Sequence, residues 1–123
     1  MKDETKIRWF SEPEDHDYTA AESYLLLVYD RDTTSKLVEK LKAEKMSTFK
    51  AKDIFRASRL SLLGVSNSHV EKDKARIANA KKLSPILLVR DPVNDQVIIA
   101  DGYHRLCAIY TVDEDAMVPC KIV

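Results

Sequence analysis

Two apolar runs joined by a short polar segment constrain the fold of this chain more than any other feature. The runs are residues 86–90 (ILLVR) and 97–100 (VIIA), and residues 91–95 (DPVND) separate them. Asp, Pro and Asn are typical of turns, so the two runs should pair as a β-hairpin. A strand with one solvent-exposed face alternates apolar and polar residues. The first run lacks this alternation, so it predicts burial on both sides of the sheet.

The second run leads straight into Asp101-Gly102, and a helical pattern follows it. Leu106 and Ile109 recur at the spacing of one helix face, and residues 118–123 predict a final strand. We therefore expect an α+β fold, a small mixed sheet with flanking helices. Residues 100–105 (ADGYHR), which we call the ADGYHR turn, should lie at one edge of that sheet.

The first part of the chain is mainly helical in pattern. The apolar spacing of residues 21–28 predicts a helix, with Asp17 as its N-cap. The spacing resumes at residues 37–41 after a polar break at residues 30–35. The pattern therefore predicts either two helices or one long bent helix.

Turn-forming and capping residues locate the middle elements. Gly64 and the polar residues after it mark a loop. Ser68 and Glu71 stand in the register of a capping box, which predicts the start of a helix. We therefore expect, in order, a strand over residues 47–51, a helix over 53–58, a loop at 64–68 and a helix over 69–80.

Composition limits the class of protein. A chain of 123 residues with 45% hydrophobic content fits one domain, so we expect an arm over residues 1–17 and a single domain over 18–123. Twenty basic and twenty acidic residues give a net charge of zero, and no overall field attracts nucleic acid or an anionic membrane. The apolar runs are short and the N-terminus is charged, so we expect a cytoplasmic protein without membrane contact.

The cysteines and histidines do not predict a metal site. Cys107 and Cys120 make no metal-ligand spacing with the histidines, and we expect two buried thiols. His16 lies in a run of acidic residues, which is typical of a solvated leader. We therefore expect no zinc site and assign no metal ligands to these cysteines and histidines.

The ADGYHR turn carries the chemistry. A buried strand that leads into a helix leaves the first-turn amides of that helix without intrahelical partners, which favours an anion. Gly102 should allow a group to approach the backbone closely. His104 and Arg105 place cations where the helix dipole opposes them, at roughly 0.3 to 1 kcal/mol each, and a bound anion would reverse that effect. The pattern therefore predicts a phosphate site at Gly102, Tyr103, His104 and Arg105.

Asp101 has two interpretations. It could be the N-cap of the helix, with its carboxylate accepting from a backbone amide. It could instead face a metal ion or a substrate hydroxyl. The pattern alone favours the N-cap. Arg105 also has an alternative to a phosphate contact, because it could form an ion pair with Asp101 or Glu114.

The C-terminal part of the chain resembles the ParB/sulfiredoxin superfamily. The resemblance rests on SPILLVRDPVNDQVIIADGYHRLCAIYTVDEDAMVPCKIV and on the upstream segment FKAKDIFRASRL, which together cover about residues 48–123. Residues 18–44 lie outside it, as a helical extension. The Asp-Gly-x-His-Arg form is most similar to free-serine kinases and stand-alone ParB-like proteins. This resemblance implies that the turn holds nucleotide phosphates.

Departures from the family narrow the activity. Sulfiredoxins place a reactive cysteine where this chain has Tyr103, which argues against a sulfiredoxin-type reductase, and Cys107 should be inert on the core side of its helix. DNA-loading ParB proteins carry a helix-turn-helix region after this domain, and residues 1–123 include no such region after the turn, so we do not expect partition-complex function from this domain by itself. In sulfiredoxin-like proteins a lysine near this region binds phosphate, which makes Lys50 and Lys52, projecting to one side of a strand, secondary candidates. Asn67 is another, unless it only caps the following helix.

The leading hypothesis is a nucleotide- or phosphate-binding domain, with phosphotransferase or nucleoside triphosphatase activity as an open question. ATP, ADP or CTP with Mg²⁺ would be the ligand, and Asp101 and His104 would be the catalytic residues. The alternative is a non-catalytic ParB-like module that binds a protein or nucleic-acid partner. The predicted core comprises Leu25, Val28, Leu41, Phe55, Ile86, Leu88, Val97, Ile99, Leu106, Ile109 and Ile122.

Overall fold

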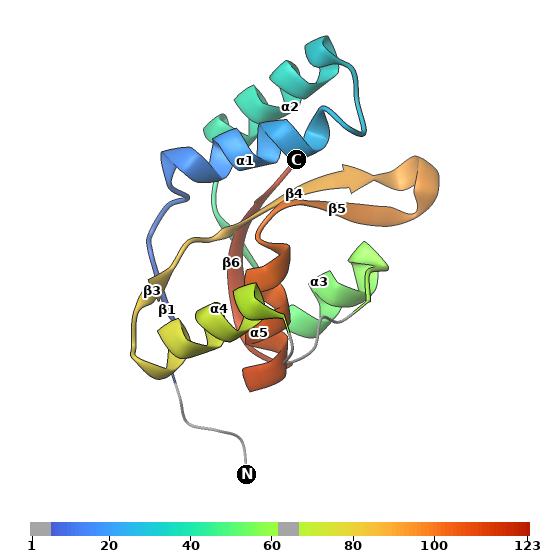
Figure 1. Ribbon diagram of the computed structural model, residues 1–123. Helices are drawn as coiled ribbons and strands as arrows, with labels where there is room; N and C mark the ends of the chain where they lie inside the picture. Colours follow the sequence, from blue (N-terminus) through green and yellow to red (C-terminus); the bar gives the residue numbers. More distant parts are fainter. Residues whose placement is uncertain (1–5, 62–66) are drawn as a thin grey trace.

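The computed structural model describes residues 6–61 and 67–123. Helices and strands alternate irregularly along the chain (Figure 1). The elements are β1 (Arg8–Trp9), α1 (Asp15–Leu25), α2 (Arg31–Ala43), β2 (Ser47–Lys50), α3 (Ala51–Ser58), α4 (Ser68–Ala78), β3 (Lys82–Leu83), β4 (Ile86–Asp91), a 3₁₀ turn (Pro92–Asn94), β5 (Gln96–Asp101), α5 (Tyr103–Val112) and β6 (Met117–Ile122).

The sheet that organises the domain is mixed, as predicted. Its strand order is β2-β6-β4-β5. The strands β4 and β5 form the expected antiparallel hairpin, while β6 runs parallel to β4 and antiparallel to β2. The short strands β1 and β3 pair in parallel in a separate two-stranded sheet. Because β5 is an edge strand, the turn that follows it lies at the sheet edge, and the α+β prediction is confirmed.

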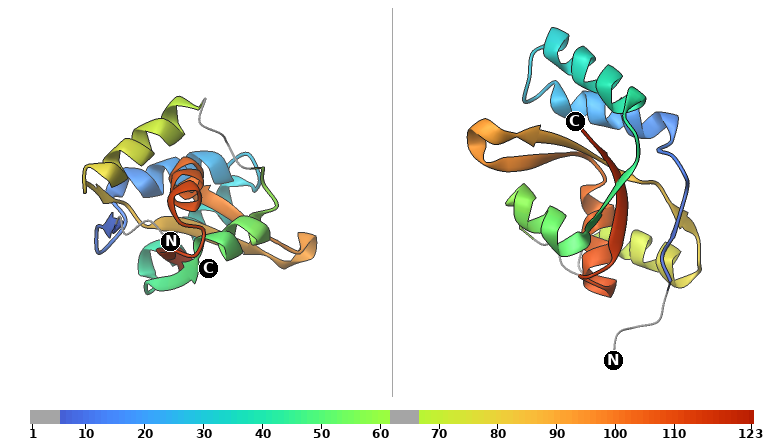
Figure 2. Two further views of the ribbon diagram at one scale, coloured as in Figure 1. Left: turned by 90° about the horizontal axis from the view of Figure 1, so that it is seen from below. Right: turned by 180° about the vertical axis from the view of Figure 1, so that it is seen from behind.

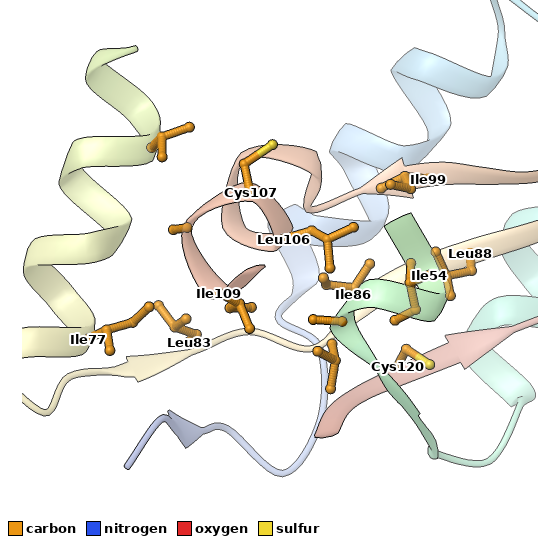
Figure 3. Close-up of a cluster of buried hydrophobic side chains, with 14 residues drawn as sticks. Ile54, Ile77, Leu83, Ile86, Leu88, Ile99, Leu106, Cys107, Ile109 and Cys120 are labelled. Atoms are coloured by element: carbon orange, nitrogen blue, oxygen red, sulfur yellow. The ribbon is translucent and has the colours of Figure 1, made fainter. Parts of the chain in front are cut away.

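Helices cover both faces of this sheet (Figures 1 and 2). Leu87 and Val89 face a cluster that includes residues of α1 and α2, whereas Ile86 and Leu88 face a cluster with residues of α3, α4 and α5. The alternating side chains of β4 therefore serve two cores, which is why its sequence is apolar without interruption. Figure 3 shows α5 in the second cluster, with Leu106 beside Ile86.

Helix α1 begins three residues earlier than the sequence predicted. Its N-cap is Glu14, and Asp17 is the third helical residue of a capping box, so the prediction of Asp17 as N-cap was wrong. The Asp17 carboxylate accepts from the Glu14 amide at 2.8 Å and is almost fully buried. Helix α1 ends at Leu25 and α2 begins at Arg31, so the two-helix alternative is correct. Asp30 is the N-cap of α2, and its side chain accepts a hydrogen bond from the Thr33 amide.

The cap of α4 also differs from the prediction. Ser68 is the first helical residue, and Asn67 is the N-cap, whose side-chain oxygen accepts from the amides of His69 and Val70. The predicted capping box of Ser68 and Glu71 was therefore wrong by one residue. The predicted loop at Gly64 lies outside the described residues.

Most of the predicted core is buried. The buried members are Leu25, Leu41, Ile86, Leu88, Ile99, Leu106 and Ile109, and the half-buried members are Phe55, Val97 and Ile122. Val28 is 47% exposed, and its assignment was wrong because α1 ends at Leu25 and the helical period stops there.

The cysteines agree with a further expectation. Cys107 and Cys120 are buried thiols, and burial raises the pKa of Cys120 to about 11. Among the described residues, the helices are too short and too polar to span a bilayer.

The backbone at Gly102 gives a test of the fold. Gly102 has φ 106°, and a Cβ there would lie 2.9 Å from Ile86 Cγ1 and 3.0 Å from Arg105 Nη2. We expect Gly102→Ala to destabilise the protein by roughly 1 to 3 kcal/mol in urea unfolding, since strain and a clash combine. Ala80 also has positive φ, 55°. The control Ala80→Gly should stay within about 1 kcal/mol of wild type; equal effects of the two changes would contradict this account.

Candidate functional site

The ADGYHR turn connects an edge strand to a helix as the sequence predicted. Strand β5 ends at Asp101, Gly102 adopts the left-handed conformation as N-cap, and α5 begins at Tyr103. The Leu106 amide donates to the Gly102 carbonyl at 2.9 Å, which closes the first turn of the helix. Tyr103, His104 and Arg105 therefore lie at the beginning of α5.

Gly102 serves packing at this turn. The missing side chain would point at Ile86 and Arg105, so its absence makes room for these two side chains. The sequence predicted that Gly102 leaves room for a ligand. In the structure, the space that a side chain of residue 102 would occupy is instead filled by Ile86 and Arg105.

Asp101 does not cap α5. The cap residue Gly102 has no side-chain hydrogen bond, and the Asp101 carboxylate accepts from Arg105 Nη2 at 2.8 Å instead. The N-cap interpretation was therefore wrong. The reason is that Asp101 belongs to β5 and is paired there with Leu87 of β4, which places it before the cap position.

Arg105 binds two carboxylates and one carbonyl. Its Nη2 also donates to the Pro85 carbonyl at 3.2 Å, and its Nη1 lies 3.8 Å from Asp17 Oδ1. All three charged side chains are largely buried, at 16% exposed for Arg105, 15% for Asp101 and 2% for Asp17. The structure thus contains the ion pair with Asp101 that was the alternative to a phosphate contact.

The paired carboxylates change the acidity of Asp101. Burial raises the pKa of Asp101, Arg105 opposes this by its charge and hydrogen bond, and the nearby Asp17 raises the pKa further. Two carboxylates face one guanidinium, so the cluster carries one excess negative charge when both acids are ionised. A raised pKa suits a group that exchanges protons.

A pocket of about 440 Å³ adjoins the turn. Its polar end consists of Asp101, Gly102 and His104, while the side chains of Tyr24 and Leu60, 44% and 42% exposed, contribute apolar surface. We call it the turn pocket; its lining residues are Tyr24, Leu60, Ile99, Ala100, Asp101, Gly102, Tyr103 and His104. It combines an apolar wall with a helix start and a titratable side chain, which is the composition of a site for a small polar ligand.

His104 lies beside a second histidine. The rings of His104 and His69 are 4.9 Å apart between centroids, at an angle of 47°. Burial lowers the pKa of His104, the charge of His69 lowers it further, and Asp73 acts in the opposite direction. Helices α4 and α5 therefore bring two imidazoles together, which the sequence spacing of 35 residues did not reveal.

Tyr103 ties the turn to the end of α3. Its hydroxyl donates to the Ser61 carbonyl, and its ring lies 5.6 Å from that of His104. Burial raises the pKa of Tyr103, and Cys107 raises it further. The phenol therefore remains protonated at neutral pH and can donate this hydrogen bond to Ser61.

The secondary candidates are dispersed. Lys50 is exposed at the end of β2, whereas Lys52 belongs to α3 and pairs with Asp115 at 2.7 Å, so the prediction that both project from one strand was wrong. The chain leaves the strand because the amides of Ala51 and Lys52 donate to carbonyls before β6. Asn67 acts as the α4 cap, one of its two predicted roles.

One candidate ligand set was not expected from the sequence. Glu14, His16 and Asp17 bring ligand atoms within 4.8 Å of one another. The Asp17 carboxylate there already accepts from the Glu14 amide and faces Arg105, and Glu14 accepts from Ser84 Oγ at 2.7 Å. Capping and ion pairing account for this cluster without a cation.

The Arg105 cluster gives a test that separates a structural from a binding role. We expect Arg105→Ala to destabilise the protein by about 3 kcal/mol in urea unfolding, because two buried carboxylates lose their cation. The control Arg56→Ala, at an 84% exposed side chain, should cost less than about 0.5 kcal/mol. Unchanged stability in Arg105→Ala, together with weaker nucleotide affinity, would assign Arg105 to ligand binding instead.

The lowered pKa of His104 predicts how stability depends on pH. The unfolded chain takes up a proton at this histidine at higher pH than the folded chain, so the stability of the native state should decrease as pH falls through about 6.5. In His104→Gln, urea unfolding should show a shallower decrease than in wild type over the same range. Both proteins contain His69, so a difference between them reports on His104. Parallel curves of stability against pH for the two proteins would contradict a lowered pKa of His104.

No protein-family model, curated protein or solved structure matches the chain. The resemblance of residues 48–123 to the ParB/sulfiredoxin superfamily stays a prediction from their motifs. The function is therefore argued from the turn, its pocket and the side chains around them.

Proposed function

We propose that this protein is a ParB/sulfiredoxin-like domain that binds a nucleotide, or another phosphorylated small molecule, in the turn pocket. The observation that carries the proposal is the composition of that pocket. One wall is formed by the ADGYHR turn, and Tyr24, Leu60 and Tyr103 contribute apolar and aromatic surface. A nucleotide needs both kinds of surface in one place.

The aromatic wall suits the base. Tyr24 is exposed on α1, and base stacking on an aromatic ring is worth about 1 to 3 kcal/mol. Leu60 adds apolar surface just after α3. Since every base has a flat apolar face, these contacts favour nucleotides as a class and leave ATP, ADP and CTP as candidates.

The helix start suits the phosphates. The amides of Tyr103 and His104 are in the first turn of α5, and a protonated His104 would donate a further hydrogen bond. Arg105 acts indirectly in this proposal, by holding Asp101 at 2.8 Å and thereby fixing the turn. Leu60 also lines a neighbouring pocket that contains Lys52, Arg56 and Arg59, so further cations lie close to the ligand.

Phosphoryl transfer or hydrolysis would use Asp101 and His104. The raised pKa of Asp101 supports a role in proton transfer with an attacking hydroxyl or water. Mg²⁺ usually takes one or two carboxylates together with substrate phosphates. Asp101 supplies the carboxylate in the lining of the turn pocket, and this carboxylate already accepts a hydrogen bond from Arg105. This donor set fits Mg²⁺ poorly, so we propose that the nucleotide binds without it.

Calorimetry with a panel of nucleotides tests the proposal. Wild-type protein should bind at least one of ATP, ADP and CTP, and Tyr24→Ala should weaken that affinity about tenfold or more by loss of stacking. The control Leu27→Ala removes an 84% exposed side chain just after α1 and should leave the affinity unchanged. Absence of binding in the millimolar range, with or without Mg²⁺, would reject the proposal. Salt-sensitive binding to DNA without nucleotide binding would favour the non-catalytic module.

A further inference from the structure

A second cavity meets the site at Arg105. It has a volume of about 280 Å³ and is formed by the beginning of α1, the end of α4, β3 and α5. We call it the α4–β3 cavity; its lining residues are Glu14, His16, Arg76, Lys82, Leu83, Ser84 and Arg105. Arg105 lines this cavity, whereas its partner Asp101 lines the turn pocket.

Three cations from three elements converge on the α4–β3 cavity. Arg76 pairs with Asp73 at 2.9 Å through Nη1, and Arg105 engages Asp101 through Nη2. A guanidinium has five N–H donors, so each of these pairs leaves donors available. The Lys82 ammonium has no ion-pair partner in the described part of the chain, and its neighbour is the Phe10 ring at 5.9 Å.

An unsatisfied donor lies on a side chain that lines the cavity. The Nε–H of Arg105 is buried without an acceptor among the described residues. A buried donor without a partner is energetically unfavourable, so an acceptor from outside the chain would relieve it. The acid that lines this cavity, Glu14, already accepts from Ser84 Oγ at 2.7 Å.

We propose that the α4–β3 cavity binds a small oxyanion, such as a phosphate group. Arg76 of α4, Lys82 of β3 and Arg105 of α5 would each donate to it, which suits an ion with several acceptor oxygens. This site is separate from the turn pocket and does not depend on nucleotide binding there. The two are connected, because an oxyanion that attracts Arg105 competes with Asp101 for the same guanidinium.

Titration of the ¹⁵N-labelled full chain with inorganic phosphate tests this site. We expect the amide signals of Lys82 and Ser84 to shift in a saturable manner, and Lys82→Ala to weaken the apparent affinity about tenfold. The control Lys74→Ala lies on the same helix as Arg76 and pairs with Glu71, and it should leave the affinity unchanged. Equal affinities in wild type and Lys82→Ala would overturn the proposal.

Further arms of the titration distinguish other sources of a shift. Acetate and chloride at matched ionic strength should produce weaker shifts than phosphate, and equal shifts with chloride would mean screening and overturn the site. Shifts confined to Tyr103 and His104 would assign phosphate to the turn pocket alone and likewise overturn it. Tyr24→Ala should retain the phosphate response while its nucleotide affinity weakens about tenfold or more, so that failure of one proposal leaves the other testable.

Discussion

The contacts of Arg105 are the constraint on which this structure depends. One guanidinium connects α1 through Asp17, β5 through Asp101, and the segment before β4 through the Pro85 carbonyl. Removal of a cation from between buried carboxylates leaves uncompensated charge, which is far more costly than loss of a surface pair. The geometry of the turn, the position of α1 and the acidity of Asp101 therefore depend on the same side chain.

The sheet and the turn could be predicted because local sequence determines them. The uninterrupted apolar run at Ile86–Val89 requires two covered faces, and the structure supplies α1 and α2 on one face and α3, α4 and α5 on the other. Asp-Gly after a buried strand predicted a helix start, and α5 begins at Tyr103. In each case the signal is local: the apolar run itself requires burial of both faces, and the Asp-Gly pair itself marks the helix start.

The partners of the site residues could not be predicted because they come from distant elements. Asp17 and Arg105 are separated by 88 positions in the sequence, and His69 and His104 by 35, so spacing alone gives no sign of either contact. Asp101, four residues before Arg105, was an expected alternative partner of that cation, whereas Asp17 was not. A buried carboxylate can compensate the cation at the helix start as well as a bound phosphate can. The prediction that Val28 belongs to the core was wrong for a simpler reason, because Val28 lies beyond the end of α1.

In the complex that we propose, a nucleotide lies between the start of α5 and Tyr24 of α1. Intermolecular nuclear Overhauser effects on the full chain, with the tightest-binding nucleotide of the panel, locate the base directly. The account predicts contacts from the base protons to the Tyr24 ring and the Leu60 methyl groups, the apolar wall of the turn pocket. Base contacts confined to other surfaces, with none to Tyr24 or Leu60, would contradict it.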